Sequence, residues 1–339
     1  MEFGWDVPNV HHGFGLDAYV REGPGEGVAV NVETFRKVSA RAEEIGFHAI
    51  WIADHVLFPD ASEVAHPFGY NSNTGREDDN VGGAHNVRSE DPIYEALATM
   101  SFLAGITERV RIGVGVLVIP YRNPVLTAKM LSTIDVLSGG RVILTAGVGW
   151  LKEAFTALEA DYDHRGAVTN EYLELMKVIW TDPKPRFEGE HYTLEPGVRF
   201  NPMPVQKPHI PIWVGGVSGP ALRRAATLAS GWLGVYQTLE DTAAMHARLT
   251  GLLRERDRDP AAFTFAHRLR FQVVADAGDV DQPCIGSPRK IADSIRRFHD
   301  VGVEHLLLAP PPGPTTAALL EQADRFANDV KPLVDDLWS

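Results

Sequence analysis

Asp54 and His55 form the pair of side chains in this sequence best suited to move a proton. Histidine is the residue whose ordinary pKa allows proton exchange near neutral pH, and a carboxylate beside it orients the ring or accepts a ligand N–H. The pair ends the apolar run HAIWIAD (48–54), which predicts a strand. The competing interpretation is an Asp that caps the loop and a His in a surface hydrogen bond.

A glycine-rich turn within VGGVSGPALRRA (214–225) has the composition of an anion site. A strand, a turn and a helix start follow one another there, so backbone N–H groups and the helix dipole favour a phosphate. The predicted contacts come from Gly215, Gly216, Val217, Ser218 and Gly219. The alternative is a tight turn whose glycines adopt positive φ. Neither a GxGxxG fingerprint nor a GxxxxGK[ST] loop occurs at a suitable strand end.

Two further strand ends contain glycines. In GVGW (147–150) the glycines leave room for a flat ring, and Trp150 either lines that pocket or simply closes the end of the strand. In IGVGVLV (112–118) the glycines weaken a central strand unless a neighbouring group approaches closely.

The remaining reactive side chains show no metal or nucleophile pattern. His11, His12, His66 and His85 lie in predicted loops without the paired spacing of metal ligands, and no HExxH, CxxC or GxSxG motif is present. His66 and His85 follow the acid–imidazole pair closely enough to border a substrate pocket. Cys284 has no evident base partner, so we expect an unreactive thiol.

Eight strand-like runs alternate with helix-like segments along the chain. The strands are predicted at 1–8, 48–54, 109–118, 141–150, 210–216, 231–236, 263–276 and 305–310. The helices are predicted at 30–46, 91–107 (capped by Asp91, with Pro92 in the first turn), 123–140, 151–180, 219–230, 239–257, 287–302 and up to Val334. Continuously apolar strands favour a parallel sheet, and eight units favour a closed (β/α)8 TIM barrel over an open doubly wound sheet. Active sites of such barrels lie at the carboxyl ends of the strands.

Two irregular excursions, near 55–91 and 181–209, interrupt an otherwise continuous alternation. Long loops in compact domains are usually functional, so we expect substrate contacts from both. No composition change marks a domain boundary, and residues 1–339 are predicted to form a single domain with these insertions.

Composition excludes several classes of protein. The 339 residues are 44% hydrophobic and 23% charged, which is typical of a globular chain. No apolar run approaches the roughly 20 residues that cross a bilayer. The net charge of -13 argues against nucleic-acid binding, although one local anion pocket stays open. A single cysteine and no visible signal peptide indicate a cytoplasmic protein without membrane or nucleic-acid partners.

Five ordered blocks resemble the bacterial luciferase-like monooxygenase superfamily of flavin and deazaflavin oxidoreductases, nearest its branch dependent on coenzyme F420. The resemblance covers about residues 1–310. The blocks are ARAEEIGFHAIWIADHV (40–56), TERVRIGVGVLVIPYRNPVLTAK (107–129), LSTIDVLSGGRVILTAGVGW (131–150), PVQKPHIPIWVGG (204–216) and ALRRAATLASGW (221–232).

This resemblance implies a (β/α)8 barrel, usually in a homodimer, with a flavin-type ring in the barrel mouth. It implies that Asp54 approaches the ring edge and that His55 donates a proton near the hydride-transfer carbon. A non-prolyl cis peptide behind the ring would fall at Gly115–Val116, with Val118 nearby. The turn at residues 215–219 would receive the cofactor phosphate.

The sequence also departs from its relatives. Trp150 replaces a catalytic Glu of the sugar-phosphate dehydrogenases, which argues against that substrate. Thr145 and Ala146 stand where relatives often have glycine and valine, and Ser230 precedes Gly231 where they often have GDGW. These changes concern the detailed pocket and leave the predicted fold intact.

We therefore predict an oxidoreductase that transfers a hydride between coenzyme F420 and a small organic substrate. The alternative is an FMN-dependent monooxygenase that receives reduced flavin from a partner reductase and activates oxygen. A third hypothesis is a non-catalytic flavin-binding protein, and the presence of both Asp54 and His55 argues against it.

Overall fold

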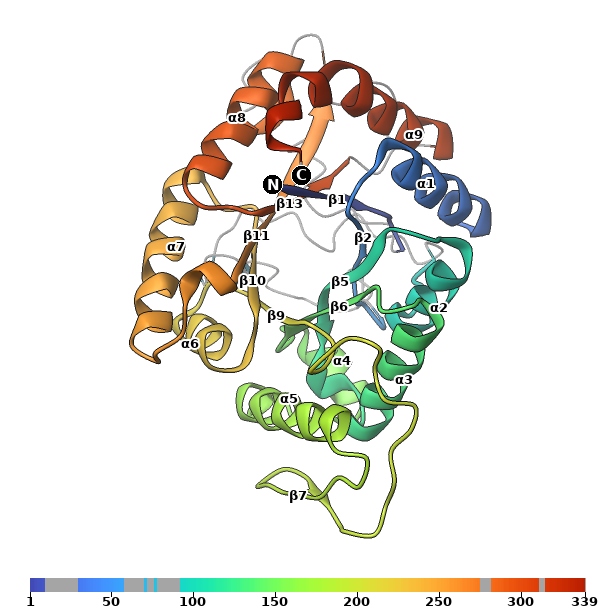
Figure 1. Cartoon of the computed structure of the whole chain (residues 1–339), viewed down its shortest axis with the longest axis vertical. Coiled ribbons are helices and arrows are strands. Elements are labelled where there is room, and N and C mark those ends of the chain that lie inside the picture. The colour runs from blue at the N-terminus through green and yellow to red at the C-terminus, as the bar shows by residue number, and fades with distance from the viewer. Residues whose placement is uncertain are drawn as a thin grey trace.

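A ring of eight parallel strands forms the centre of the computed structural model, which describes residues 1–9, 30–57, 70–71, 76–77, 92–274, 282–310 and 315–338. The strands are β1 (Glu2–Asp6), β2 (Ala49–Ile52), β5 (Arg111–Val118), β6 (Val142–Gly147), β9 (Ile212–Gly215), β10 (Gly231–Val235), β11 (Thr264–Val273) and β13 (His305–Ala309). They pair in the order β1-β2-β5-β6-β9-β10-β11-β13, and β13 returns to β1 (Figure 1). This confirms the predicted closed (β/α)8 barrel.

Helices surround this ring, and each strand is followed by at least one of them (Figure 1). They are α1 (Val32–Ile45), α2 (Ala96–Ile106), α3 (Pro124–Leu137), α4 (Lys152–Ala157), α5 (Arg165–Thr181), α6 (Gly219–Leu228), α7 (Leu239–Arg254), α8 (Pro288–Asp300) and α9 (Thr316–Arg325). The short strand β12 (Cys284–Gly286) pairs with β11. Within the described ranges, no helix is long and apolar enough to cross a membrane.

The barrel interior is a packed core. Trp51 and Trp213 point inward with ring centroids 5.4 Å apart, and the Trp51 indole N–H donates to Nε2 of His305 at 3.2 Å. A Cβ added at Gly113 would lie under 3.0 Å from the Trp51 ring, and one at Gly231 equally close to Trp213. The glycines in the strands therefore make room for indoles, which confirms the close approach expected within 112–118. A ligand must bind above this core.

Helix α2 begins later than the sequence predicts, and Asp91 lies outside the described residues. Its N-cap is Glu95, whose Oε2 accepts from the N–H of Ala98 at 2.7 Å. Arg122 donates to the other oxygen of Glu95 at 2.7 Å. The predicted placement of Pro92 in the first helical turn is wrong, because an ion pair from another element fixes the helix start at Glu95.

The excursion at 181–209 packs outside the barrel. It contains the hairpin of β7 (Phe187–Glu188) and β8 (Thr193–Leu194). Further along, the N–H groups of Val205 and Gln206 donate to Oδ2 of Asp135 on α3, at 2.8 and 3.2 Å. The Gln206 amide donates to the carbonyl of Val142, the first residue of β6. These bonds hold Val205 and Gln206 at the amino end of the barrel, away from the predicted site residues, and substrate contacts from the rest of the excursion at 181–209 stay a prediction.

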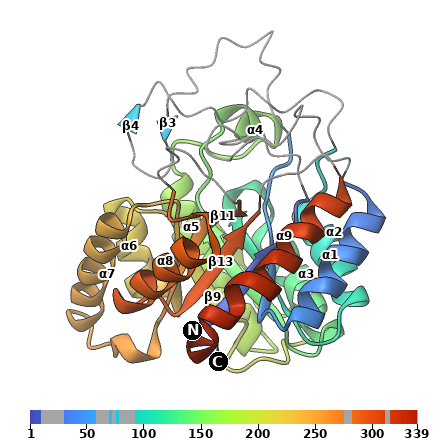
Figure 2. The same ribbon diagram turned by 90° about the horizontal axis from the view of Figure 1, so that it is seen from above.

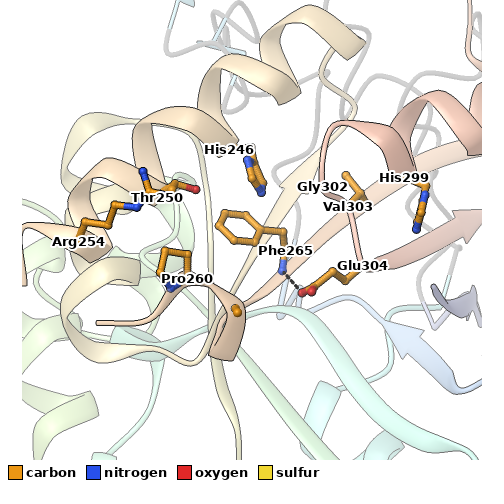
Figure 3. Close-up of a pocket in the computed structure, with 10 residues that line it drawn as sticks. His246, Thr250, Arg254, Pro260, Phe265, His299, Gly302, Val303 and Glu304 are labelled. Carbon is orange, nitrogen blue, oxygen red and sulfur yellow. Dashed lines mark hydrogen bonds between the residues drawn. The ribbon is translucent and has the colours of Figure 1, made fainter. Parts of the chain in front are cut away.

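The two ends of the barrel differ. Helix α4 and the hairpin of β3 (Tyr70–Asn71) and β4 (Arg76–Glu77) lie at the end opposite both termini (Figure 2). At the amino ends of the strands, a hollow of about 420 Å³ opens between α7 and α8, bordered by His246 and Phe265 (Figure 3). The amino ends serve stability in this fold class, and the predicted site residues lie at the carboxyl ends.

Candidate functional site

The carboxyl ends of β2, β5, β6 and β9 bring the predicted site residues to one rim, because all eight strands run in parallel. Asp54 and His55 follow β2, and Gly115 with Val116 lies in the last half of β5. Trp150 follows β6, and the glycine turn follows β9. The first two segments are about 60 residues apart in the chain, and the parallel pairing of β2 with β5 makes them neighbours.

The Asp54 carboxylate is enclosed by protein donors. Arg122 binds both of its oxygens in a bidentate ion pair, with two N···O distances of 2.7 Å. The N–H of Val118 donates to Oδ2 at 2.8 Å, and none of the Asp54 side chain is exposed. A contact between Asp54 and a ring edge would require these bonds to yield. The arrangement favours a role for Asp54 in fixing the end of β5.

The peptide bond between Gly115 and Val116 is cis, as predicted. The strand register between β5 and β6 shifts at this point, so Val116 leaves the ladder and points over the core. A Cβ on Gly147 or on Gly215 would lie under 3.0 Å from a methyl group of Val116. The space predicted for a ring beside Gly147 is thus filled by Val116, whose partly exposed side chain forms an apolar floor for the mouth.

Trp150 and Val118 take different places around the next turn. Gly149 has a φ of 78°, and a Cβ there would lie 2.6 Å from Val118 Cγ1 and 2.8 Å from the ring of Phe155. Val118 is 6% exposed and packs beneath the turn. Trp150 is half-buried on the rim, where an aromatic ring can border a ligand.

The turn after β9 leaves a set of backbone donors unused. The Trp232 indole N–H donates to the Gly216 carbonyl at 2.8 Å, so the N–H of the same peptide, on Val217, points the opposite way. Gly216 has a φ of 105°. Among the described residues, the N–H groups of Gly216, Val217, Ser218 and Gly219 find no protein acceptor. The Ser218 hydroxyl caps α6 by accepting from Ala221.

Two arginines stand beside this turn, and sequence reasoning missed both. A Cβ on Gly219 would lie 3.3 Å from Nη1 of Arg223 on α6 and 3.1 Å from Nη2 of Arg248 on α7. Within the described part of the chain neither guanidinium forms an ion pair. Two cations near a capped helix N-terminus with unused N–H groups are an arrangement that favours an anion. The RR pair in the sequence is a signal for Arg223, whereas Arg248 reaches the turn through tertiary packing.

His55 lies near a buried ion pair that the sequence did not reveal. Arg268 on β11 binds Asp6, the last residue of β1, and both side chains are nearly buried. Burial raises the pKa of Asp6. Burial, followed by the positive charge of Arg268, lowers the pKa of His55 from 6.5 to about 4. The His55 imidazole is therefore neutral at pH 7, which leaves a ring nitrogen in the form that can accept a proton, and its lowered pKa makes it a weaker base than a solvated histidine.

The remaining reactive candidates of the sequence are four histidines and one cysteine. His11, His12, His66 and His85 lie outside the described residues. Cys284 is buried in β12, and burial raises the pKa of its thiol to about 12, as expected for an unreactive cysteine.

Comparison with curated proteins finds enzymes that use two cofactors. The FMNH(2)-dependent dimethylsulfone monooxygenase of Pseudomonas putida is 28% identical over 240 residues, 68% of this chain and 55% of that protein. The F420-dependent glucose-6-phosphate dehydrogenase of Amycolatopsis mediterranei is 31% identical over 164 residues, 46% of this chain and 40% of that protein. An uncharacterised protein of Mycobacterium tuberculosis is 30% identical over 193 residues, 57% of this chain. The chain spans 64% of that protein's length.

The fold and the family agree. The crystal structure of the monooxygenase RslO1 from Streptomyces bottropensis matches with a TM-score of 0.75 at 18% identity, covering 98% of this chain and 99% of that chain. The family model described as luciferase-like monooxygenase matches residues 1–282. The chain therefore belongs to the luciferase-like monooxygenase family, which includes F420-dependent and FMN-dependent enzymes.

Proposed function

We propose that this protein is an oxidoreductase that transfers a hydride between coenzyme F420 and a small organic substrate. The observation that carries the proposal is a neutral His55 on the same barrel rim as an anion-binding turn. A proton acceptor and a phosphate site together are what hydride transfer from a hydroxyl group to a phosphate-bearing cofactor requires.

The residues on the rim fit such a cofactor. Val116 offers an apolar floor, and Trp150 an aromatic border. The unused N–H groups after β9, with Arg223 and Arg248, suit a phosphate tail. When bound, the deazaflavin ring accepts or returns a hydride.

The chain's own residues would divide the remaining work. His55, neutral at pH 7, takes the proton of a substrate hydroxyl at a ring nitrogen and returns it in the reverse direction. Asp54 and Arg122 hold the backbone of Val118, and through it the cis turn on which the cofactor would lie. We assign Asp54 and Arg122 positioning roles.

A second candidate is a monooxygenase that uses reduced FMN from a partner reductase. The relative from Pseudomonas putida favours it, because that match covers more of this chain than the match to the F420-dependent relative. The anion site accommodates the phosphate of either cofactor. The remaining expectations, a homodimer in the cytoplasm, stay proposals that sedimentation and cell fractionation would test.

Titration of the purified protein with F420 and with FMN, each oxidised and reduced, separates the candidates. Quenching of tryptophan fluorescence reports binding, since Trp150 lies on the rim and Trp232 holds the anion turn. We expect tight, saturable F420 binding and a slower or weaker response to FMN. Tight FMN binding without any response to F420 would replace the first candidate by the second. Turnover of neither cofactor with any alcohol or oxygen substrate would leave a non-catalytic binding protein.

A further inference from the structure

Two arginines alternate on the inward face of β11. Arg268 and Arg270 continue the series that Thr264 and Ala266 begin, and their partners in the ladder are Leu307 and Ala309. Ala309 is the last residue of β13, so Arg270 lies at the carboxyl rim. The inward residues of β11 are small in the interior of the barrel, as at Ala266, and basic towards the mouth, as at Arg268 and Arg270.

These two arginines differ in their partners. Arg268 is neutralised by Asp6. Arg270 lies with its guanidinium carbon 4.0 Å from the ring centroid of Tyr236, and its Nε is buried without a hydrogen-bond partner. Across the described ranges, no carboxylate forms an ion pair with Arg270. Arg122, another arginine of this rim, pairs with Asp54 and Glu95.

Tyr236 is fixed in place for this contact. Its backbone has a φ of 60°, a conformation uncommon outside glycine, and its N–H donates to the carbonyl of Arg268 at 3.0 Å. The aromatic face orients the guanidinium of Arg270 but supplies no negative charge and no hydrogen-bond acceptor for its N–H groups. Among the residues that the structure describes at the mouth, Arg270 is therefore a cation that no carboxylate neutralises.

We propose that Arg270 recognises a carboxylate on the substrate, so that the substrate class is a small organic acid with its reacting carbon near His55. This inference rests on the proposed function, because it uses the same rim. A guanidinium pairs with a carboxylate through two parallel hydrogen bonds, which fixes the orientation of the ligand as well as its position. Arg268, whose positive charge acts on His55, lies two residues before Arg270 on the same strand.

The cofactor phosphate has its own cations elsewhere. Arg223 and Arg248 stand at the start of α6, after β9, whereas Arg270 belongs to β11, which pairs with β10 and β13. The other anion that Arg270 could meet is the negative charge of a reduced cofactor ring. A substrate carboxylate and a reduced cofactor ring both offer a negative charge to Arg270. The ring has this charge only when the cofactor is reduced, so binding measured with oxidised and with reduced cofactor distinguishes the two.

The experiment uses calorimetric titration with benzoate and butyrate, and with benzamide and butyramide as neutral probes. The purified protein is titrated both alone and loaded with oxidised F420 or FMN, and the affinity of each variant for the oxidised and the reduced cofactor is measured in parallel. We expect at least one carboxylate to bind at least 10-fold more tightly than its amide. Arg270→Gln should remove this preference and leave amide affinity and cofactor affinity within twofold, while Arg270→Lys should retain part of it. Arg289→Gln, which removes an exposed cation of α8, is the matched control and should change nothing.

Three results would overturn the proposal. The first is equal binding of carboxylates and amides by the unaltered protein, or binding of neither. The second is an unchanged carboxylate preference in Arg270→Gln. The third is a variant that loses affinity for reduced cofactor alone, which would assign Arg270 to the ring charge. Failure of every cofactor to bind would contradict the proposed function separately, because the carboxylate preference is also measured without cofactor.

Discussion

His55 shows how position changes the chemistry of a common side chain. A solvated histidine has a pKa close to 6.5, whereas burial and the nearby Arg268 lower that of His55 to about 4. The neutral ring is then the form present over the physiological range, and this is the form that a general base requires, although the lowered pKa weakens its attraction for a proton.

Replacing His55 should therefore affect turnover more than stability. We expect His55→Ala to lower kcat by about 10²-fold or more, since general bases typically contribute 10² to 10⁴. Activity of the unaltered enzyme should persist on lowering the pH and fall only near the His55 pKa of about 4, where the ring becomes protonated. Steady-state rates against pH test both statements. An unchanged rate in His55→Ala would assign the proton to another group, and His299→Ala, on an exposed helix face, is the control.

The ion pair of Asp54 and Arg122 holds the backbone of Val118 at the end of β5. Removing one partner of a buried pair leaves the other charge uncompensated, which typically costs about 3–5 kcal/mol. We expect Asp54→Asn to lower the free energy of unfolding by roughly 3 kcal/mol, and the double variant with Arg122→Met to lose less than the sum of the two single changes. Urea unfolding measures these values. Arg41→Gln, which breaks an exposed pair with Asp324, should cost under about 1 kcal/mol. Additive losses would contradict the coupling.

At the scale of elements, strands β5, β6 and β9 interlock through Val116. Gly147 and Gly215 lie on neighbouring strands, and each leaves the space that a methyl group of Val116 occupies. Small residues here are required by the cis turn of β5, so glycines that suggest room for a ligand instead accommodate a side chain of the protein.

Gly147→Ala tests this interlock. The added Cβ would lie under 3.0 Å from Val116, so we expect a loss of stability of about 1–3 kcal/mol through overpacking. In a Val116→Ala background the same change should cost clearly less, because the conflicting methyl groups are gone. Thermal or urea unfolding of the four proteins gives the comparison. An equal cost in both backgrounds would show that Val116 does not fill this space.

The anion turn is assembled from two helices. Arg223 from α6 and Arg248 from α7 flank Gly219, and their charges add to the helix dipole. A side chain at Gly216 would be strained at a φ of 105° whatever the ligand, so exposed charge changes test the site more cleanly.

We expect Arg223→Gln and Arg248→Gln each to weaken cofactor binding severalfold and to reduce its salt dependence, because fewer charges attract the phosphate. Fluorescence titration at two ionic strengths measures this effect. Both positions are exposed, so folding should be unaffected, and Arg256→Gln, further along the chain after α7, serves as the control. Equal affinity and equal salt dependence in all three variants would move the phosphate away from α6.

At the scale of the whole molecule, the stability of the barrel depends on a buried titratable residue that lies away from the candidate site, His267. His267 on β11 is fully buried, with its ring 5.2 Å from that of Phe298 on α8. Burial lowers its pKa from 6.5 to about 3. Unfolding exposes the ring, and the unfolded chain then binds a proton that the folded chain does not.

Between pH 6.5 and 3, His267 should therefore destabilise the fold as the pH falls, with a slope of up to about 1.4 kcal/mol per pH unit. His267→Phe keeps an aromatic ring and removes the proton, so we expect a smaller loss of stability in acid than in the unaltered protein. Denaturant unfolding at a series of pH values measures the difference. Parallel curves for the two proteins would show that His267 is not the titrating group.

The sequence by itself determined the order of strands and helices, the closed barrel and the strand-end positions of Asp54, His55 and the glycine turn. Hydrophobic periodicity and turn residues are local, so they are visible without any knowledge of distant contacts. Arg268 and Arg270 lie within a predicted strand, but the sequence pattern did not single them out, because their role depends on which face of β11 turns inward.

Only the tertiary structure decided what each of these groups touches. Arg122 pairs with Asp54 across 68 positions, and Arg268 pairs with Asp6 across 262. The direct pairing of β2 with β5 sets the first of these partners, and barrel closure, which brings β1 beside β13, sets the second. Neither gives Arg270 a carboxylate in the described ranges. Charge pairing, burial and the resulting pKa values depend on distance in space, and spacing along the chain does not contain that distance.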